Sequence, residues 1–126
     1  MRRPIKKVTI TNGLYRCEVL VADTLWLRMR GLLFRYDWKG GMLLPTKSIH
    51  TFFMHQSLDV YFLDQSGKVL KALLDFPPGK ISPIVREAKM VLEVPVGALG
   101  NVLPGSRLYI DQKNKTGGFL YGRTHL

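Results

Sequence analysis

The chain has 126 residues, which fits one domain and leaves little room for a second. Its composition of 46% hydrophobic and 22% charged residues is typical of a globular protein and excludes an intrinsically disordered chain. A single cysteine, Cys17, excludes an intramolecular disulfide and an all-cysteine zinc site. No apolar run reaches the ~18 residues that a membrane-spanning helix needs.

The formal net charge of +10 is concentrated at the two ends of the chain. Residues 1–7 form a basic N-terminal arm that contains four Lys or Arg and no acid, and residues 112–126 form a basic C-terminal tail with three and no acid. Residues 8–111 are left as a single, nearly neutral domain. A positive field attracts nucleic acid or anionic lipid without defining a specific site. The charge therefore predicts only weak, non-specific nucleic-acid binding.

The chain begins with a predicted β-hairpin. Residues 5–10 and 14–21 have the residue types and alternation of strands. The Asn12-Gly13 pair between them is the strongest short-range signal for a hairpin turn.

The hydrophobic period then changes to that of a helix. Asp23 or Thr24 can cap a helix from Leu25 to about Phe34, whose apolar side chains form one broad arc. The Gly40-Gly41 pair interrupts the chain again.

The rest of the chain has the pattern of a β protein. Six segments have strand length and composition: 42–44, 49–54, 58–63, 69–74, 89–94 and 107–110. Residues 64–67 predict the turn of a hairpin, 76–83 a loop, and 96–102 one short helical turn. Many short strands with one helix predict a mainly β (α+β) fold, a small antiparallel barrel-like single domain. This domain, rich in strands, extends from residue 8 to residue 111.

An ordered series of short blocks spans most of this domain. They are Arg30-Gly31-Leu32-Leu33-Phe34-Arg35, Gly41-Met42-Leu43-Leu44, residues 49–54, residues 58–64, Gly67-Lys68-Val69 and residues 91–97. The series resembles an uncharacterised family filed as domain of unknown function 192, over roughly residues 14–111. The resemblance implies a compact, mainly β, barrel-like fold with a helix and implies no activity. Some members of that family are exported, whereas no apolar segment follows the basic start of this chain, so we expect a cytoplasmic protein.

Motifs for cofactors and metals are absent from the sequence. Gly79-Lys80 lacks the upstream glycine and the following Ser or Thr of a P-loop, and no G-x-G-x-x-G follows a strand. His50 and His55 are five residues apart on or beside a predicted strand, so alternation directs them to opposite faces, and His125 lies in the tail. We therefore expect neither a cofactor nor a metal ion.

Nucleophilic catalysis has no sequence signature either. Ser57 is not part of a G-x-S-x-G motif. Cys17 falls on the apolar face of its predicted strand, where an inert thiol is expected.

Three charged residues occupy apolar positions. Arg30 lies inside the apolar arc of the predicted helix, and Asp59 and Glu93 each share a strand face with apolar side chains. Buried charges need partners, so we expect an ion pair of Arg30 with Asp59 as the first choice and Glu93 as the second, or carboxylates bonded by the backbone. The functional alternative is a working site.

Three functional hypotheses remain. The leading one is a non-catalytic module that binds an unidentified small ligand or protein partner; its candidate binding residues are Arg30, His50, Met54, Asp59 and Glu93. The alternative is an enzyme in which Asp59 or Glu93 acts as the acid or base with His50. The third is a weak nucleic-acid binder that uses the basic ends together with the rings of Phe52, Phe53 and Tyr61.

Overall fold

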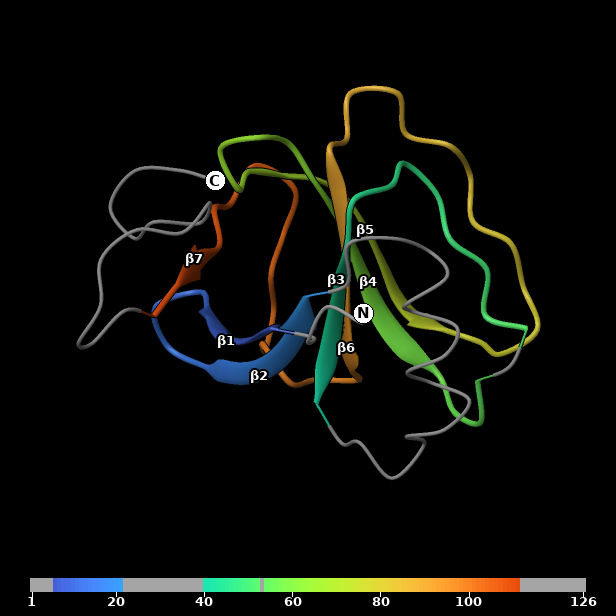
Figure 1. Ribbon diagram of the computed structural model, residues 1–126, viewed down its shortest axis with the longest axis horizontal. Coiled ribbons are helices and arrows are strands. Elements are labelled where there is room, and N and C mark those ends of the chain that lie inside the picture. Colours follow the sequence, from blue (N-terminus) through green and yellow to red (C-terminus); the bar gives the residue numbers. More distant parts are fainter. Residues whose placement is uncertain (1–5, 22–39, 53, 112–126) are drawn as a thin grey trace, which may run out of the picture.

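The computed structural model describes residues 6–21, 40–52 and 54–111 (Figure 1). Within these residues the chain forms strands and no helix. The strands are β1 (Lys6–Thr11), β2 (Arg16–Val21), β3 (Gly41–Leu44), β4 (Leu58–Leu63), β5 (Val69–Phe76), β6 (Met90–Pro95) and β7 (Tyr109–Ile110). The expected mainly β class is confirmed. The helix expected at residues 25–34 lies outside the described residues, as do residues 1–5 of the basic arm and the whole basic tail.

The strands form one sheet in the order β5-β4-β6-β3-β2-β1-β7. Every neighbouring pair is antiparallel except β2 and β3, which are parallel. A parallel pair needs a crossover connection of about a dozen residues or more, and residues 22–40 supply that length.

The sheet curls into a half-barrel (Figure 1). The segment just before β7, at one edge, forms backbone hydrogen bonds to the start of β5, at the other edge. Val69 N–H donates to Ser106 O at 2.7 Å, Gly105 N–H to Val69 O at 2.8 Å, and Leu108 N–H to Gly67 O at 2.9 Å. These bonds draw the two edges toward each other and limit the exposed edge of the sheet.

Both faces of the central strands are buried. One apolar cluster, the inner cluster, fills the curl of the sheet and includes Ile10, Tyr61 and Val94. A second, the outer cluster, includes Val60 and Val91 on the opposite face. The loops 45–57 and 77–88 contribute Ile49 and Ala88 to the outer cluster, so they cover that face. Burial on two faces explains why β3, β4 and β6 are nearly continuous apolar runs rather than alternating ones.

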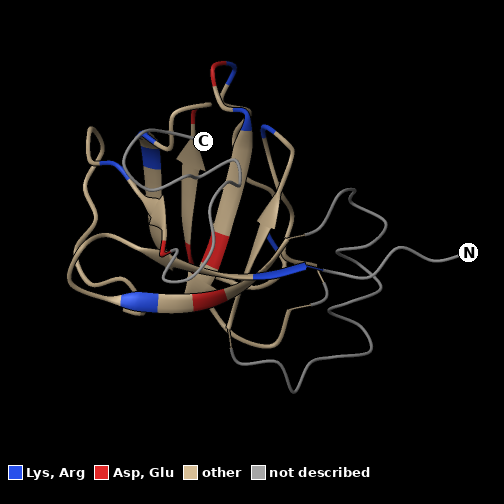
Figure 2. Ribbon diagram, turned by 60° about the vertical axis from the view of Figure 1, so that its left-hand side comes forward, with Lys and Arg blue, Asp and Glu red and all other residues tan. Residues whose placement is uncertain are grey.

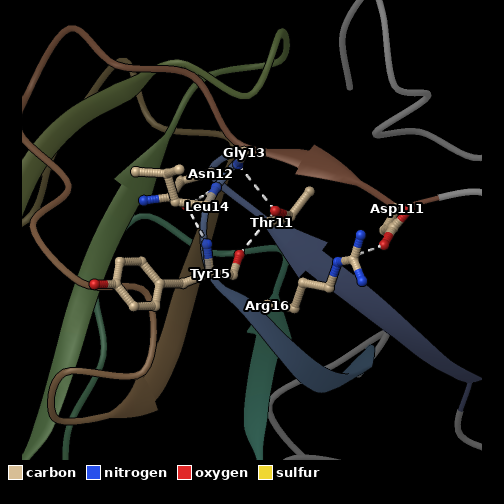
Figure 3. A network of polar contacts seen from close by, with 7 residues as sticks. All are labelled: Thr11, Asn12, Gly13, Leu14, Tyr15, Arg16 and Asp111. Carbon is tan, nitrogen blue, oxygen red and sulfur yellow. Dashed lines mark hydrogen bonds and ion pairs between the residues drawn. The ribbon is translucent and has the colours of Figure 1, made fainter.

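The predicted turn at Asn12 is confirmed (Figure 3). Asn12 Oδ1 accepts the N–H groups of Leu14 at 2.9 Å and Tyr15 at 2.8 Å, and Asn12 Nδ2 donates to Leu99 O at 2.8 Å. Gly13 has a φ of 103°, which a residue with a side chain rarely adopts. Asn12 thus closes the hairpin and also attaches it to the loop after β6.

The turn between β4 and β5 is also confirmed. Gly67 N–H donates to Asp64 O at 3.1 Å, and one carboxylate oxygen of Asp64 accepts from Ser66 Oγ at 2.7 Å and Lys68 N–H at 3.0 Å. Partial burial acts to raise the pKa of Asp64, but these hydrogen bonds and the charge of Arg107 outweigh it and hold the pKa below its usual value.

The structure differs from the sequence expectation at residues 49–54. Among the described positions of this segment only His50 forms a β-bridge, to Ile81. The facing segment contains Pro77, Pro78 and Pro83, which have no N–H to donate, so a continuous ladder cannot form. A loop held by isolated bonds replaces the expected strand.

Candidate functional site

Two acids interrupt the otherwise uncharged central strands (Figure 2). The register of β4 and β6 separates these acids. Asp59 is paired with Val94, a member of the inner cluster, whereas Glu93 is paired with Val60, a member of the outer cluster. Paired residues of neighbouring strands point to the same face of a sheet. Asp59 and Glu93 therefore lie on opposite faces and do not form one site.

Asp59 binds the backbone. Its side chain is 3% exposed; Oδ1 accepts the N–H of Asp75 at 2.9 Å, and Oδ2 accepts the N–H of Gly97 at 2.8 Å. Both donors have a positive φ: 55° at Asp75, where the register of β5 with β4 is irregular, and 82° at Gly97, in the turn after β6. The carboxylate thus ties the end of β5 and the turn after β6 to β4. Of the two structural alternatives expected from the sequence, an ion pair with Arg30 or a carboxylate bonded by the backbone, the described residues show the second for Asp59.

Glu93 lies at a small pocket on the outer face. Its side chain is 2% exposed. The pocket has a volume of about 30 Å³ and is lined by Gly40, Gly41, Met42, Met54, Gln56, Leu58, Glu93 and Pro95. A site needs roughly 10–15 Å³ for one water molecule, so this pocket holds about two waters or one small polar group. Met54 and Glu93, two of the candidate residues, are brought together here.

Gly41 shapes this pocket because it permits a close approach of β3 to β6. A Cβ at this position would lie 2.5 Å from Glu93 O and 2.8 Å from Val94 Cγ1, and both distances are too short for real contacts. The Gly40-Gly41 pair was expected only to interrupt the chain. A glycine at the start of an apolar strand is the signal that could have indicated this close approach.

His50 is not among the residues that line the pocket. Its ring stacks on that of Phe52, with centroids 4.8 Å apart and an interplanar angle of 21°. His55 is exposed. Arg30 lies outside the described residues, so its ion pair with an acid stays a prediction.

Two further titratable side chains are buried in the inner cluster. Burial raises the pKa of Tyr61 to about 12, with a smaller contribution from the charge of Asp59. Tyr61 is 0% exposed, which excludes it as one of the exposed rings of the nucleic-acid hypothesis. Burial also raises the pKa of the Cys17 thiol, more than the backbone hydrogen bond from Gly41 lowers it. Both side chains are uncharged near neutral pH.

Within the described ranges, no three His, Cys, Asp or Glu side chains come close enough together to hold a metal ion. No helix in the same part of the chain is both long and apolar enough to cross a membrane.

Comparisons with known proteins identify the family of the β domain and relatives of a large part of it. The family model of domain of unknown function 192 (DUF192), described as an uncharacterized ACR, matches residues 7–110. A UPF0127 protein from Thermococcus sibiricus is 38% identical over 65% of this chain, and the match spans 57% of that relative's length. A UPF0127 protein from Pyrococcus horikoshii is 34% identical over 69% of this chain and 80% of its own length.

A solved structure of a protein of unknown function from Novosphingobium aromaticivorans has the same fold. It superposes with a TM-score of 0.63 at 23% sequence identity and covers 82% of this chain and 84% of its own.

Proposed function

This chain belongs to the uncharacterised DUF192 family, and we propose that it is a non-catalytic binding module whose ligand site is the pocket at Glu93. The observation that carries the proposal is a carboxylate side chain, 2% exposed, at an open pocket of about 30 Å³. A carboxylate in the wall of a pocket accepts hydrogen bonds from a group that enters it, and such bonds are stronger when the donor is a cation, so the pocket suits a positively charged donor.

The size and walls of the pocket narrow the class of ligand. The volume accommodates a single ammonium-sized group and not a whole metabolite. The walls near Glu93 include apolar side chains of Met42, Met54 and Leu58, which suit a methylene stem. We therefore propose a ligand that inserts a primary alkylammonium end, such as a small amine or a lysine-like side chain, while the remainder of the ligand stays outside.

The placement of the other candidates supports binding over catalysis. An acid–base pair requires two titratable groups within hydrogen-bond reach of the same reacting atom. Asp59 is on the opposite face of the sheet with each oxygen bonded to a backbone N–H, and His50 stacks on Phe52 outside the pocket. We propose that the protein binds its ligand in the cytoplasm, where disulfides are rare and a free thiol such as Cys17 stays reduced.

The proposal is tested by thermal shift with n-butylammonium and with butan-1-ol, which has the same stem and no charge. A ligand of the native state raises the melting temperature in a saturable way, by an amount corresponding to about 2.7 kcal/mol at one hundred times its Kd. We expect butylammonium to raise the melting temperature of the wild type and of Glu87→Gln, an exposed control, but not of Glu93→Gln. Equal effects of amine and alcohol, or a shift retained in Glu93→Gln, would contradict the proposal.

A second variant tests the proposal even if the Glu93→Gln protein does not fold. Met54→Ala removes part of the apolar wall and keeps the carboxylate. It should weaken binding of butylammonium more than binding of methylammonium, which lacks the stem. A variant that binds both amines as the wild type does would show that they bind elsewhere.

A further inference from the structure

Two loops on the outer side of the molecule are joined into a rigid unit, which we call the loop ribbon (residues 47–52 and 77–85). Ile49 N–H donates to Ser82 Oγ at 2.9 Å, and Ser82 N–H donates back to Ile49 O at 2.8 Å. Thr51 N–H donates to Lys80 O at 2.8 Å, and Gly79 N–H donates to Thr51 O at 2.7 Å. These bonds fix which side chains of the ribbon point inward and which point outward.

Part of the loop ribbon has hydroxyl residues inside and apolar residues outside, whereas Ile49 is buried in the outer cluster. The hydroxyl residues Thr51 and Ser82 are buried, at 0% and 4% exposure. The apolar residues Phe52, Ile81 and Ile84 are 51%, 67% and 71% exposed. A single exposed apolar residue is ordinary, whereas several on one rigid element mark a surface that meets an apolar partner.

The exposed apolar side chains are linked through His50. His50 and Ile81 are bridge partners, which places their side chains on the same face, and the ring of His50 stacks on Phe52. Ile84 follows three residues after Ile81 on the same segment. The aromatic pair and Ile81 therefore share one face of the ribbon. Together with Ile84, a further exposed aliphatic side chain on the same segment, we call them the patch.

The surroundings of the patch are basic. The loops 45–57 and 77–89 contain four Lys or Arg and one acid; they are Lys47, Lys80, Arg86 and Lys89, with Glu87. All five residues are exposed, although the Lys47 ammonium donates to the carbonyl oxygens of Arg86 at 2.9 Å and Ala88 at 2.6 Å. Lys80, Arg86 and Lys89 are the cations that a partner of the patch would meet. A partner of this surface is therefore expected to combine apolar character with negative charge.

We propose that the loop ribbon docks on an anionic lipid membrane, with Phe52, Ile81 and Ile84 at the boundary of headgroups and acyl chains and the cations on lipid phosphates. The two loops run along one margin of the molecule in the view of Figure 1, on the side away from β7. Branched aliphatic side chains suit acyl chains better than nucleic-acid bases, which stack on rings. Each Lys or Arg near the surface adds attraction to anionic headgroups. This site is separate from the Glu93 pocket and does not depend on it.

The test is co-sedimentation of the full chain with phosphatidylcholine vesicles that contain about one-third phosphatidylglycerol, because a charged patch needs anionic lipid. The variant Ile81→Ser with Ile84→Ser should lower the vesicle partition coefficient at least about tenfold, since two aliphatic side chains no longer move from water into the membrane. The matched control Leu14→Ser with Leu103→Ser changes side chains that are 86% and 64% exposed outside the ribbon, and it should partition as the wild type does.

The basic ends could bind the vesicles by charge alone, and such binding is screened by salt. In that case both double variants would bind equally and salt would abolish the binding of each. That result would overturn the proposal. Wild-type chain that does not sediment with the anionic vesicles would also overturn it. A third result would overturn the proposal as well: the Ile81→Ser, Ile84→Ser variant loses binding to a single-stranded oligonucleotide but binds vesicles as the wild type does.

A spectroscopic measurement reports insertion directly. An environment-sensitive fluorophore on Ile84→Cys should shift its emission to the blue on anionic vesicles, and Cys17 is buried and stays unlabelled. The same fluorophore on Leu103→Cys should show no shift. Equal shifts at the two positions would contradict docking through the loop ribbon.

Discussion

Replacing Asp59 by Asn tests whether this carboxylate holds the fold together. The wild-type side chain accepts one backbone N–H on each oxygen, from Asp75 at 2.9 Å and from Gly97 at 2.8 Å. Asn has one carbonyl oxygen, so it keeps one bond in a weaker, neutral form and presents its own N–H to the other donor. Hydrogen bonds to a charged group contribute about 1.5–3 kcal/mol each. We expect Asp59→Asn to lower the free energy of unfolding by about 2–3 kcal/mol and Asp59→Ala by about 3–5 kcal/mol.

The assay is equilibrium unfolding in urea, with the midpoint and the slope fitted separately. The control is Asp75→Asn, which changes an exposed side chain where φ is 55°, a conformation that Asn tolerates. It should alter stability by no more than about 0.5 kcal/mol. Amide hydrogen exchange at Gly97 should accelerate in Asp59→Asn more than exchange in β1. A loss below about 1 kcal/mol, or unchanged exchange at Gly97, would refute the clamping role of Asp59.

The remaining predictions concern three other positions. Gly41→Ala should destabilise the protein by about 1–3 kcal/mol in a urea melt, because its Cβ would lie 2.5 Å from Glu93 O, and wild-type stability would disprove the close approach. The pKa of Asp64 is lower in the folded chain than its ordinary 3.8, so its stabilisation is present above pH 3.8 and lost as pH falls through the lower folded pKa. The stability difference between wild type and Asp64→Asn should therefore shrink on acidification, and a difference that grows would have the wrong sign. Arg30→Met should cost about 3 kcal/mol, and a double-mutant cycle with Asp59→Asn should find coupling to that acid, the first-choice partner; no coupling rejects this ion pair.

Local features of the fold could be predicted because their determinants are adjacent in the chain. The Asn12-Gly13 hairpin and the turn at Asp64 depend on side chains that bond backbone groups within four residues. The bounds of β4 match the expected segment 58–63, since its apolar run ends at polar residues on both sides. The mainly β class follows from the number and spacing of such segments.

Features that depend on strand pairing were not accessible in this way. The sequence indicated strands on both sides of residues 22–40 but not that β2 and β3 pair in parallel. The segment 49–54 has the composition of a strand, and the prolines of a partner more than twenty residues away prevent it from becoming one.

The candidate site shows the same division. Composition alone marked Asp59 and Glu93 as charged residues at apolar positions, and both are buried as expected. Alternation within each strand says which neighbours share a face with each acid, but not which face of β4 matches which face of β6. That match is the register Val60 to Glu93, and a shift by one residue would place both acids on the same face. Only the tertiary structure decides the register, because it depends on how both faces of the sheet pack at once.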